Sequence, residues 1–254
     1  MYRKGWILMA AAWLTLAAGI ALLAADKELP EGFTPLFNGK DLSGWKVPAG
    51  DNGHWKVIDG VIDYDARSES RAQDKSLWTE KSFGDFVLRV DWRLKTDPGF
   101  RHPVQIILPD GSHKKGPDGK DETVEIDDVD SGIYLRGSPK SQVNIWMWPI
   151  GSGEVWGYRT DRSVPPEVRA GVTPKKKADR RRGEWNTFEI TMKGDRLWVN
   201  LNGEEVISNA QLPGVPKQGE LALQHHGSYD AKTGRWTGPP SLVQFRNIAI
   251  KELK

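Results

Sequence analysis

The stretch Asp85-Phe86-Val87-Leu88-Arg89-Val90-Asp91-Trp92-Arg93-Leu94-Lys95 alternates large apolar side chains with mostly charged ones. A period of two residues is typical of a β-strand, in which successive side chains point to opposite faces of a sheet. The side chains expected on the apolar face are Phe86, Leu88, Val90, Trp92 and Leu94. The stretch therefore predicts an antiparallel sheet with one buried and one solvated face.

Two hairpins are predicted on either side of this strand. Asp59-Gly60 separates the strand-like runs 54–58 and 61–64, and Asn202-Gly203 separates 196–201 from 204–208. Both dipeptides suit the positive φ angles of a type I′ turn. Further strand candidates are 76–80, 104–108, 132–135, 142–148, 187–192, 221–226 and 242–251.

A dozen short strands without an amphipathic helix of three turns indicate an all-β protein, an antiparallel jelly-roll sandwich of two sheets. No change of composition divides residues 30–254, so one domain is expected there. Two proline- and glycine-containing segments, 97–121 and 159–183, are predicted to be long loops.

Composition excludes several classes of protein. The 254 residues include no cysteine, which rules out disulfides, Cys-ligated metals and a thiol nucleophile. Lys and Arg number 36 against 34 Asp and Glu, and residues 26–254 carry no net formal charge. A dedicated nucleic-acid binder is therefore not expected.

Residues 1–25 have the pattern of an export signal. Arg3 and Lys4 precede an uncharged, apolar stretch over 5–25. We expect an exported protein, periplasmic or extracellular. The stretch is also long enough to serve as an uncleaved membrane anchor, which is the alternative to cleavage.

Motifs along most of the chain resemble the 3-keto-disaccharide hydrolase domain family. In one-letter code they include GFTPLFNGKDLSGW at 32–45, HWKVIDGVI at 54–62, DSGIYLR at 130–136, LQHHG at 223–227 and VQFRNI at 243–248. The resemblance implies a concanavalin- or laminarinase-like jelly roll that binds carbohydrate on its concave sheet and cleaves glycosides oxidised at C3. Two positions depart from the family pattern: run 141–146 lacks a carboxylate, and 224–227 has a second His in place of an acid.

A sugar-binding surface is predicted on the run 142–148. Gln142, Asn144, Trp146 and Trp148 share one face by parity, and indoles stack on sugars while amides bond their hydroxyls. The alternative is that both indoles belong to the core. Two further binding candidates are Tyr158, on the glycine-rich segment 151–159, and Gln224.

Three side chains are candidates for the chemistry. His226 shares parity with Gln224 and is the expected base, whereas His225 should point to the other face. Arg136 is the candidate cation for an enolate, its alternative being a structural pair with a carboxylate such as Asp130. Glu154 is the candidate acid, or else a solvated turn residue.

The two runs of charged residues, 122–130 and 175–182, are expected to be solvated loops. The acidic run 122–130 has Glu125 and Asp127 at the parity of a two-carboxylate glycosidase, but Val129 stands where a further acid is needed, so a solvated loop is expected. The basic run 175–182 is likewise expected to be a solvated loop. Whether His102 and His113 approach a divalent metal is left open.

The expected activity is cleavage of 3-keto-glycosides. A ketone at C3 acidifies the C2 proton, so the C1 substituent can leave by elimination and water can add back. The leading alternative is a non-catalytic carbohydrate-binding module, and protein adhesion is a third. A carbohydrate is the expected ligand; the oligomeric state is left open.

Overall fold

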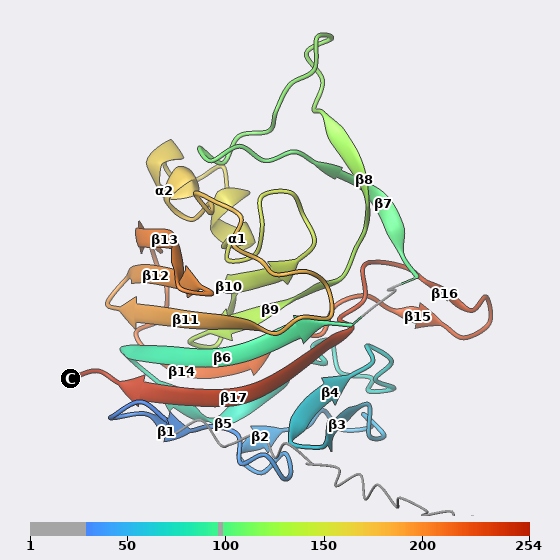
Figure 1. Cartoon of the computed structure of the whole chain (residues 1–254), viewed down its shortest axis with the longest axis vertical. Coiled ribbons are helices and arrows are strands. Elements are labelled where there is room, and N and C mark those ends of the chain that lie inside the picture. Colours follow the sequence, from blue (N-terminus) through green and yellow to red (C-terminus); the bar gives the residue numbers. More distant parts are fainter. Residues whose placement is uncertain (1–28, 96–98) are drawn as a thin grey trace, which may run out of the picture.

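The computed structural model describes residues 29–95 and 99–254, and the predicted signal segment lies outside them. Two antiparallel sheets pack face to face as a jelly roll (Figure 1). The larger sheet contains, in spatial order, β13 (Glu204–Gln211), β12 (Arg196–Leu201), β11 (Asn186–Lys193), β6 (Phe86–Leu94), β17 (Val243–Glu252), β4 (Val61–Tyr64) and β3 (Trp55–Ile58), with β1 (Thr34–Pro35) pairing with β17. The smaller sheet contains β10 (Ser138–Trp146), β9 (Asp130–Leu135), β14 (Gly219–Leu223), β5 (Leu77–Phe83) and β2 (Trp45–Lys46).

Smaller elements decorate the sandwich. The pairs β7 (Arg101–Gln105) with β8 (Thr123–Asp127) and β15 (Tyr229–Asp230) with β16 (Arg235–Trp236) form two-stranded sheets. The helices α1 (Trp156–Arg159) and α2 (Pro166–Gly171) are short. No helix within the described part of the chain is long and apolar enough to cross a membrane.

Strand β6 confirms the alternation expected from its sequence. Its apolar side chains are buried and the intervening ones are half-buried. It lies between β11 and β17, so it is a central strand of the larger sheet. The core that it faces includes the inward side chains of the smaller sheet: Ile133, Leu135, Val143, Ile145, Leu221 and Leu223.

Both predicted hairpins form. Asp59 and Gly60 have φ angles of 50° and 75°, and Asn202 and Gly203 have 57° and 90°. Each turn thus has two successive residues in the left-handed region, which suits the twist of antiparallel strands. The hairpins connect β3 to β4 and β12 to β13.

Three predicted boundaries are wrong in ways that matter for the site. The segment 97–121 contains β7 and the isolated bridges Ile107–His113 and Lys115–Asp121, so much of it is a paired arm (Figure 1, top) rather than a loop. β10 ends at Trp146 and β14 ends at Leu223. His226 therefore lies on the connection after the strand, where the chain leaves the β14–β9 ladder.

Candidate functional site

The outer face of the smaller sheet presents polar side chains. Ile133 and Val143 point into the core, so their strand neighbours point to the opposite side. These neighbours include Gly132, Tyr134 and Asn144, and Gly132 pairs with Asn144 across β9 and β10. The arm β7–β8 leads into β9 after a two-residue connection (Figure 1).

Two predicted sugar-binding amides meet on this face. Gln142 Nε2 donates to Gln224 Oε1 at 2.6 Å and to the carbonyl of Ser131 at 3.2 Å. Gly132 makes room for this contact, because a Cβ at that position would lie 2.4 Å from Gln142 Nε2. The structure therefore joins Gln142 and Gln224 into one hydrogen-bonding group.

His226 has a defined tautomer. Its Nδ1 lies 2.7 Å from the carbonyl oxygen of Pro239, which can only accept, so Nδ1 carries the proton. The lone pair of Nε2 is left free and lies 3.8 Å from Asp130 Oδ2. The His226 side chain is 38% exposed, so a ligand can reach this nitrogen. These are the properties required of a general base.

Asp130 provides the negative partner of this imidazole. Its side chain is largely buried, and burial raises the pKa of Asp130 above its ordinary value, opposed by the positive charge that His226 can carry. Its Oδ1 has no hydrogen-bond partner among the described residues. Asp130 can thus stabilise an imidazolium at His226.

A second imidazole, His102, contacts the neighbouring carboxylate, Asp128. His102 Nε2 donates to Asp128 Oδ2 at 2.8 Å, and Trp148 Nε1 donates to the same oxygen at 3.1 Å. The prediction of a solvated loop over the acidic run is wrong: residues 123–127 form strand β8, Asp128 has no exposed surface and Asp130 is half-buried, and only the exposure expected of Glu125 and Asp127 is confirmed. Asp128 and Asp130 are two residues apart, and each has an imidazole partner, His102 and His226 respectively.

Glu154 lies beside Asn144 at the edge of β10, but its side chain is covered. Its side chain has no exposed surface and contacts the guanidinium of Arg159, whose Nη1 reaches Nε2 of His113 at 3.3 Å. His113 in turn bonds Asp121 Oδ2 at 2.9 Å through Nδ1. Burial raises the pKa of Glu154 to about 7. The solvated-turn interpretation is wrong, and in this conformation Glu154 has no surface from which to reach a sugar.

Arg136 is placed away from His226 by its hydrogen bonds. Its side chain is buried, and its guanidinium donates to the carbonyls of Gly84 at 2.8 Å and Gly194 at 2.6 Å and to Asp85 Oδ1 at 2.7 Å. Its backbone φ of 52° turns the chain at the end of β9. The alternative that Arg136 forms a structural pair with a carboxylate is thus confirmed, but the carboxylate is that of Asp85 and not that of Asp130.

The predicted platform of two free indoles is not present. Trp146 is 3% exposed and stacks on Trp148 with ring centroids 4.4 Å apart, so its ring faces are covered. Trp148 is half-buried, and its hydrogen bond to Asp128 keeps it at the site. Tyr158 packs in the core and donates to the carbonyl of Pro213, away from the amide group. Asn144 lies on the site face but is 3% exposed.

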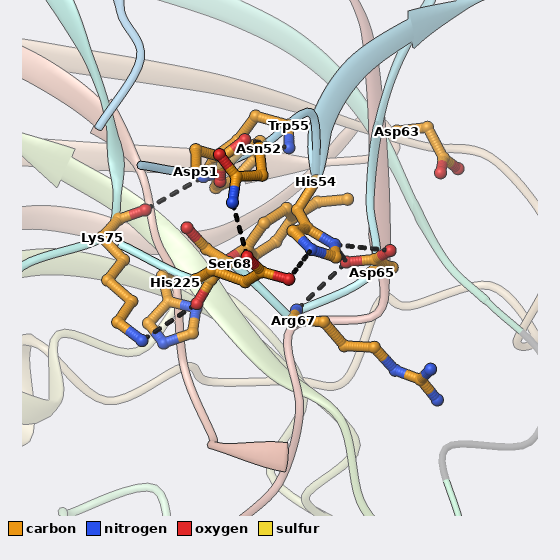
Figure 2. A network of polar contacts seen from close by, with 12 residues as sticks. Asp51, Asn52, His54, Trp55, Asp63, Asp65, Arg67, Ser68, Lys75 and His225 are labelled. Atoms are coloured by element: carbon orange, nitrogen blue, oxygen red, sulfur yellow. Dashed lines mark hydrogen bonds and ion pairs between the residues drawn. The ribbon is translucent and has the colours of Figure 1, made fainter. Parts of the chain in front are cut away.

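The neighbouring histidine belongs to a different network, shown in Figure 2. His225 Nδ1 lies 2.6 Å from the Tyr64 hydroxyl, while His54 bonds Asp65 nearby at 2.9 Å. Burial lowers the pKa of His225 to about 4, which keeps its imidazole neutral. The two adjacent imidazoles therefore have different surroundings and different accessibilities.

The donors do not fit a metal centre. Within residues 29–95 and 99–254, no group of three or more His, Asp or Glu side chains has the arrangement that a metal ion requires. We therefore assign no step of the reaction to a metal.

Glu154 should make stability depend on pH in a recognisable direction. Its pKa is about 7 in the folded protein against an ordinary 4.5, so the folded state binds more protons between these values and stability falls as pH rises through them. His225 has the opposite effect between about 4 and 6.5, because its pKa is lowered on folding. The Glu154→Gln variant lacks this titrating carboxyl group. We therefore expect the melting temperature of wild type minus that of the variant to decrease steadily from pH 4.5 to 7.

Measuring both proteins removes the His225 contribution, which they share. The variant can be less stable at every pH because Arg159 loses its partner, and the test concerns the slope only. A difference that stays constant across this range would contradict the raised pKa.

The fold is a jelly-roll sandwich with a polar outer face on its smaller sheet, and the comparison with protein families assigns its class. The family model described as the 3-keto-alpha-glucoside-1,2-lyase-like domain matches residues 32–251. The chain belongs to this family, which confirms the resemblance seen in its motifs. No curated protein matches the chain.

Solved structures support the fold. Three structures of a "putative glycosyl hydrolase" from Parabacteroides distasonis ATCC 8503 are similar to this chain. The first is 22% identical with a TM-score of 0.55, covering 88% of this chain and 85% of that one. The second is 20% identical with a TM-score of 0.52, covering 88% and 95%. The third is 20% identical with a TM-score of 0.50, covering 87% and 99%. At these identities the likeness concerns the fold.

Proposed function

We propose that this protein cleaves 3-keto-glycosides by elimination across C1 and C2 followed by hydration. The observation that carries the proposal is His226, whose Nε2 lone pair is free and lies 3.8 Å from Asp130 Oδ2; His102 bonds Asp128, two residues before Asp130. Both imidazole side chains are partly exposed, at 38% and 29%. The family supports the substrate class, and we assign the base to His226 and the acid to His102 as part of the proposal.

His226 acts as the base. Its Nε2 takes the C2 proton, which the C3 ketone acidifies, and the C2–H electron pair forms the C2–C3 double bond of the enolate. Asp130 stabilises the resulting imidazolium from 3.8 Å. Gln142 is half-buried on the same face; both of its amide hydrogens are used by Gln224 and Ser131, so its Oε1 can accept a hydrogen bond from a sugar hydroxyl.

His102 acts as the acid in place of Glu154. With Nε2–H held by Asp128, its imidazolium presents Nδ1–H. The enolate electrons form the C1–C2 double bond and expel the leaving oxygen, which takes the proton of His102. Water then adds its hydroxyl to C1, returning one proton to His102, while His226 returns a proton to C2. The net reaction consumes one water and leaves both imidazoles as they began.

Export is part of the proposal. Supported by Arg3, Lys4 and the apolar run 5–25, we place the activity outside the cytoplasm, with an N-terminal anchor as the alternative to a cleaved signal.

The test compares two chromogenic substrates, a 3-keto-glucoside and its unoxidised parent, with and without EDTA. We expect release of the chromophore from the ketone alone, with no loss in EDTA. Release from the parent at an equal rate would overturn the elimination. Release from neither, together with measurable sugar binding, would make the chain a binding module, which the Gln142–Gln224 group could also serve.

A further inference from the structure

A hollow at the edge of the sandwich lies outside the proposed reaction. It has a volume of about 220 Å³ and lies between the two sheets where β6, β11 and the end of β10 meet the basic segment 177–182. Its apolar wall contains Trp92, Leu94, Trp146 and Met147. Trp146 separates the hollow from Trp148 and therefore from the His102–Asp128 pair.

The rim of the hollow is strongly cationic. Lys177, Arg180, Arg181 and Arg182 line it, against one carboxylate, Asp179. That carboxylate is already engaged, since both of its oxygens accept from the backbone N–H of Ser152. Among the described residues, none of the four cations has a carboxylate within 4.0 Å, although Lys176 next to them pairs with Glu204. With four cations and one carboxylate, the rim of the hollow therefore carries an excess of three positive charges.

Unused donors supply an independent sign of a ligand. Trp92 is 1% exposed and lines the hollow, and its indole N–H has no partner among the described residues. The Nε of Arg182 is also buried and unpartnered, while Nη2 of the same guanidinium donates to the carbonyl of Asp127. Buried donors without acceptors are rare in proteins. Both observations call for an acceptor in the hollow, and the cationic rim favours one that carries negative charge.

We propose that this hollow binds an oxyanion, and that its source is the carboxylate of an acidic sugar such as a uronic acid. Guanidinium groups bind carboxylates through paired, charge-assisted hydrogen bonds. The choice of a sugar as the source rests on the proposed function. The oxyanion site itself rests only on the donors and charges of the hollow.

Titration calorimetry with sodium glucuronate, glucose and sodium sulfate tests the proposal on the whole protein. We expect glucuronate to bind and glucose not to bind, with an affinity that falls as salt is added. The double variant Lys177→Gln/Arg181→Gln should lose about tenfold or more, because it removes two charged donors from an exposed rim. Trp92→Phe, which keeps an aromatic ring and removes only the N–H, should weaken binding several-fold.

Arg235→Gln is the matched control. Arg235 is an exposed arginine on β16 that does not line the hollow, so its replacement should leave the affinity unchanged. If sulfate binds and its binding also depends on Lys177 and Arg181, the hollow is an oxyanion site, but its ligand is an inorganic oxyanion and not an acidic sugar. Absence of binding for both anions, or equal binding by the double variant with an unchanged melting temperature, would overturn the proposal. Because calorimetry needs no turnover, these outcomes do not depend on the reaction at His226.

Discussion

The variant His226→Ala should lower kcat on a 3-keto-glucoside by about 10²- to 10⁴-fold, the range typical of a lost general base. Nε2 of His226 is the only nitrogen of that ring left free, since Nδ1 donates to Pro239. Asp130→Asn should reduce kcat less, because it leaves the base in place and removes only the charge that stabilises the imidazolium. Steady-state kinetics with the chromogenic ketone measures both effects.

The adjacent imidazole provides a close control. His225→Ala removes a ring that bonds Tyr64 in the network of Figure 2 and should change kcat by no more than a few-fold. A His226→Ala protein that keeps its melting temperature and its full activity would remove His226 from the mechanism. Equal losses in both variants would indicate a shared structural cause.

Replacing Arg136 with methionine should destabilise the fold by about 3 kcal/mol, because several backbone carbonyls lose the donor that the buried guanidinium supplies. The substitution leaves Asp85 without its guanidinium partner and the carbonyls of Gly84 and Gly194 without their donors. These groups belong to separate segments, so Arg136 holds the β5–β6 and β11–β12 turns to the end of β9. For a chain of this size the melting temperature should fall by about 10 °C.

Activity separates this structural role from the one that the sequence predicted. At a temperature where the variant is folded, kcat for the ketone should match that of wild type within a few-fold. The exposed Arg71→Met serves as a control for the change of residue type. A large loss of kcat with an unchanged melting temperature would restore Arg136 to the reaction.

The sandwich could be predicted because its signals are local. The alternation over β6 and the Asp59-Gly60 and Asn202-Gly203 turns depend on neighbouring residues only, and all three form as expected. The role of Arg136 could not be read in this way, because its acceptors lie between 51 and 80 residues away along the chain. A guanidinium can bind a substrate in a cleft or hold backbone carbonyls and a carboxylate inside the fold, and the residue type alone does not distinguish these roles.

The site was predictable only in part. Gln142, Gln224 and His226 do lie on or beside the outer face of the smaller sheet, as parity indicated. His102 reaches Asp128 across 26 residues because the arm β7–β8 folds back on itself, and no local pattern encodes that return. A signal did exist for the carboxylates: Asp128 and Asp130 alternate with Val129, which is fully buried, as expected where a strand begins.

The most direct test of the central claim is the fate of the hydrogen at C2. Cleavage of a 3-keto-glucoside in D₂O, with the product analysed by NMR and compared with an enzyme-free sample, reports whether the C2–H bond breaks during turnover. Elimination and hydration predict a product carrying deuterium at C2 in step with release of the leaving group, and no such product from His226→Ala. A released sugar that retains its original hydrogen at C2, together with no primary isotope effect on kcat/KM for a substrate deuterated at C2, would contradict the proposed mechanism.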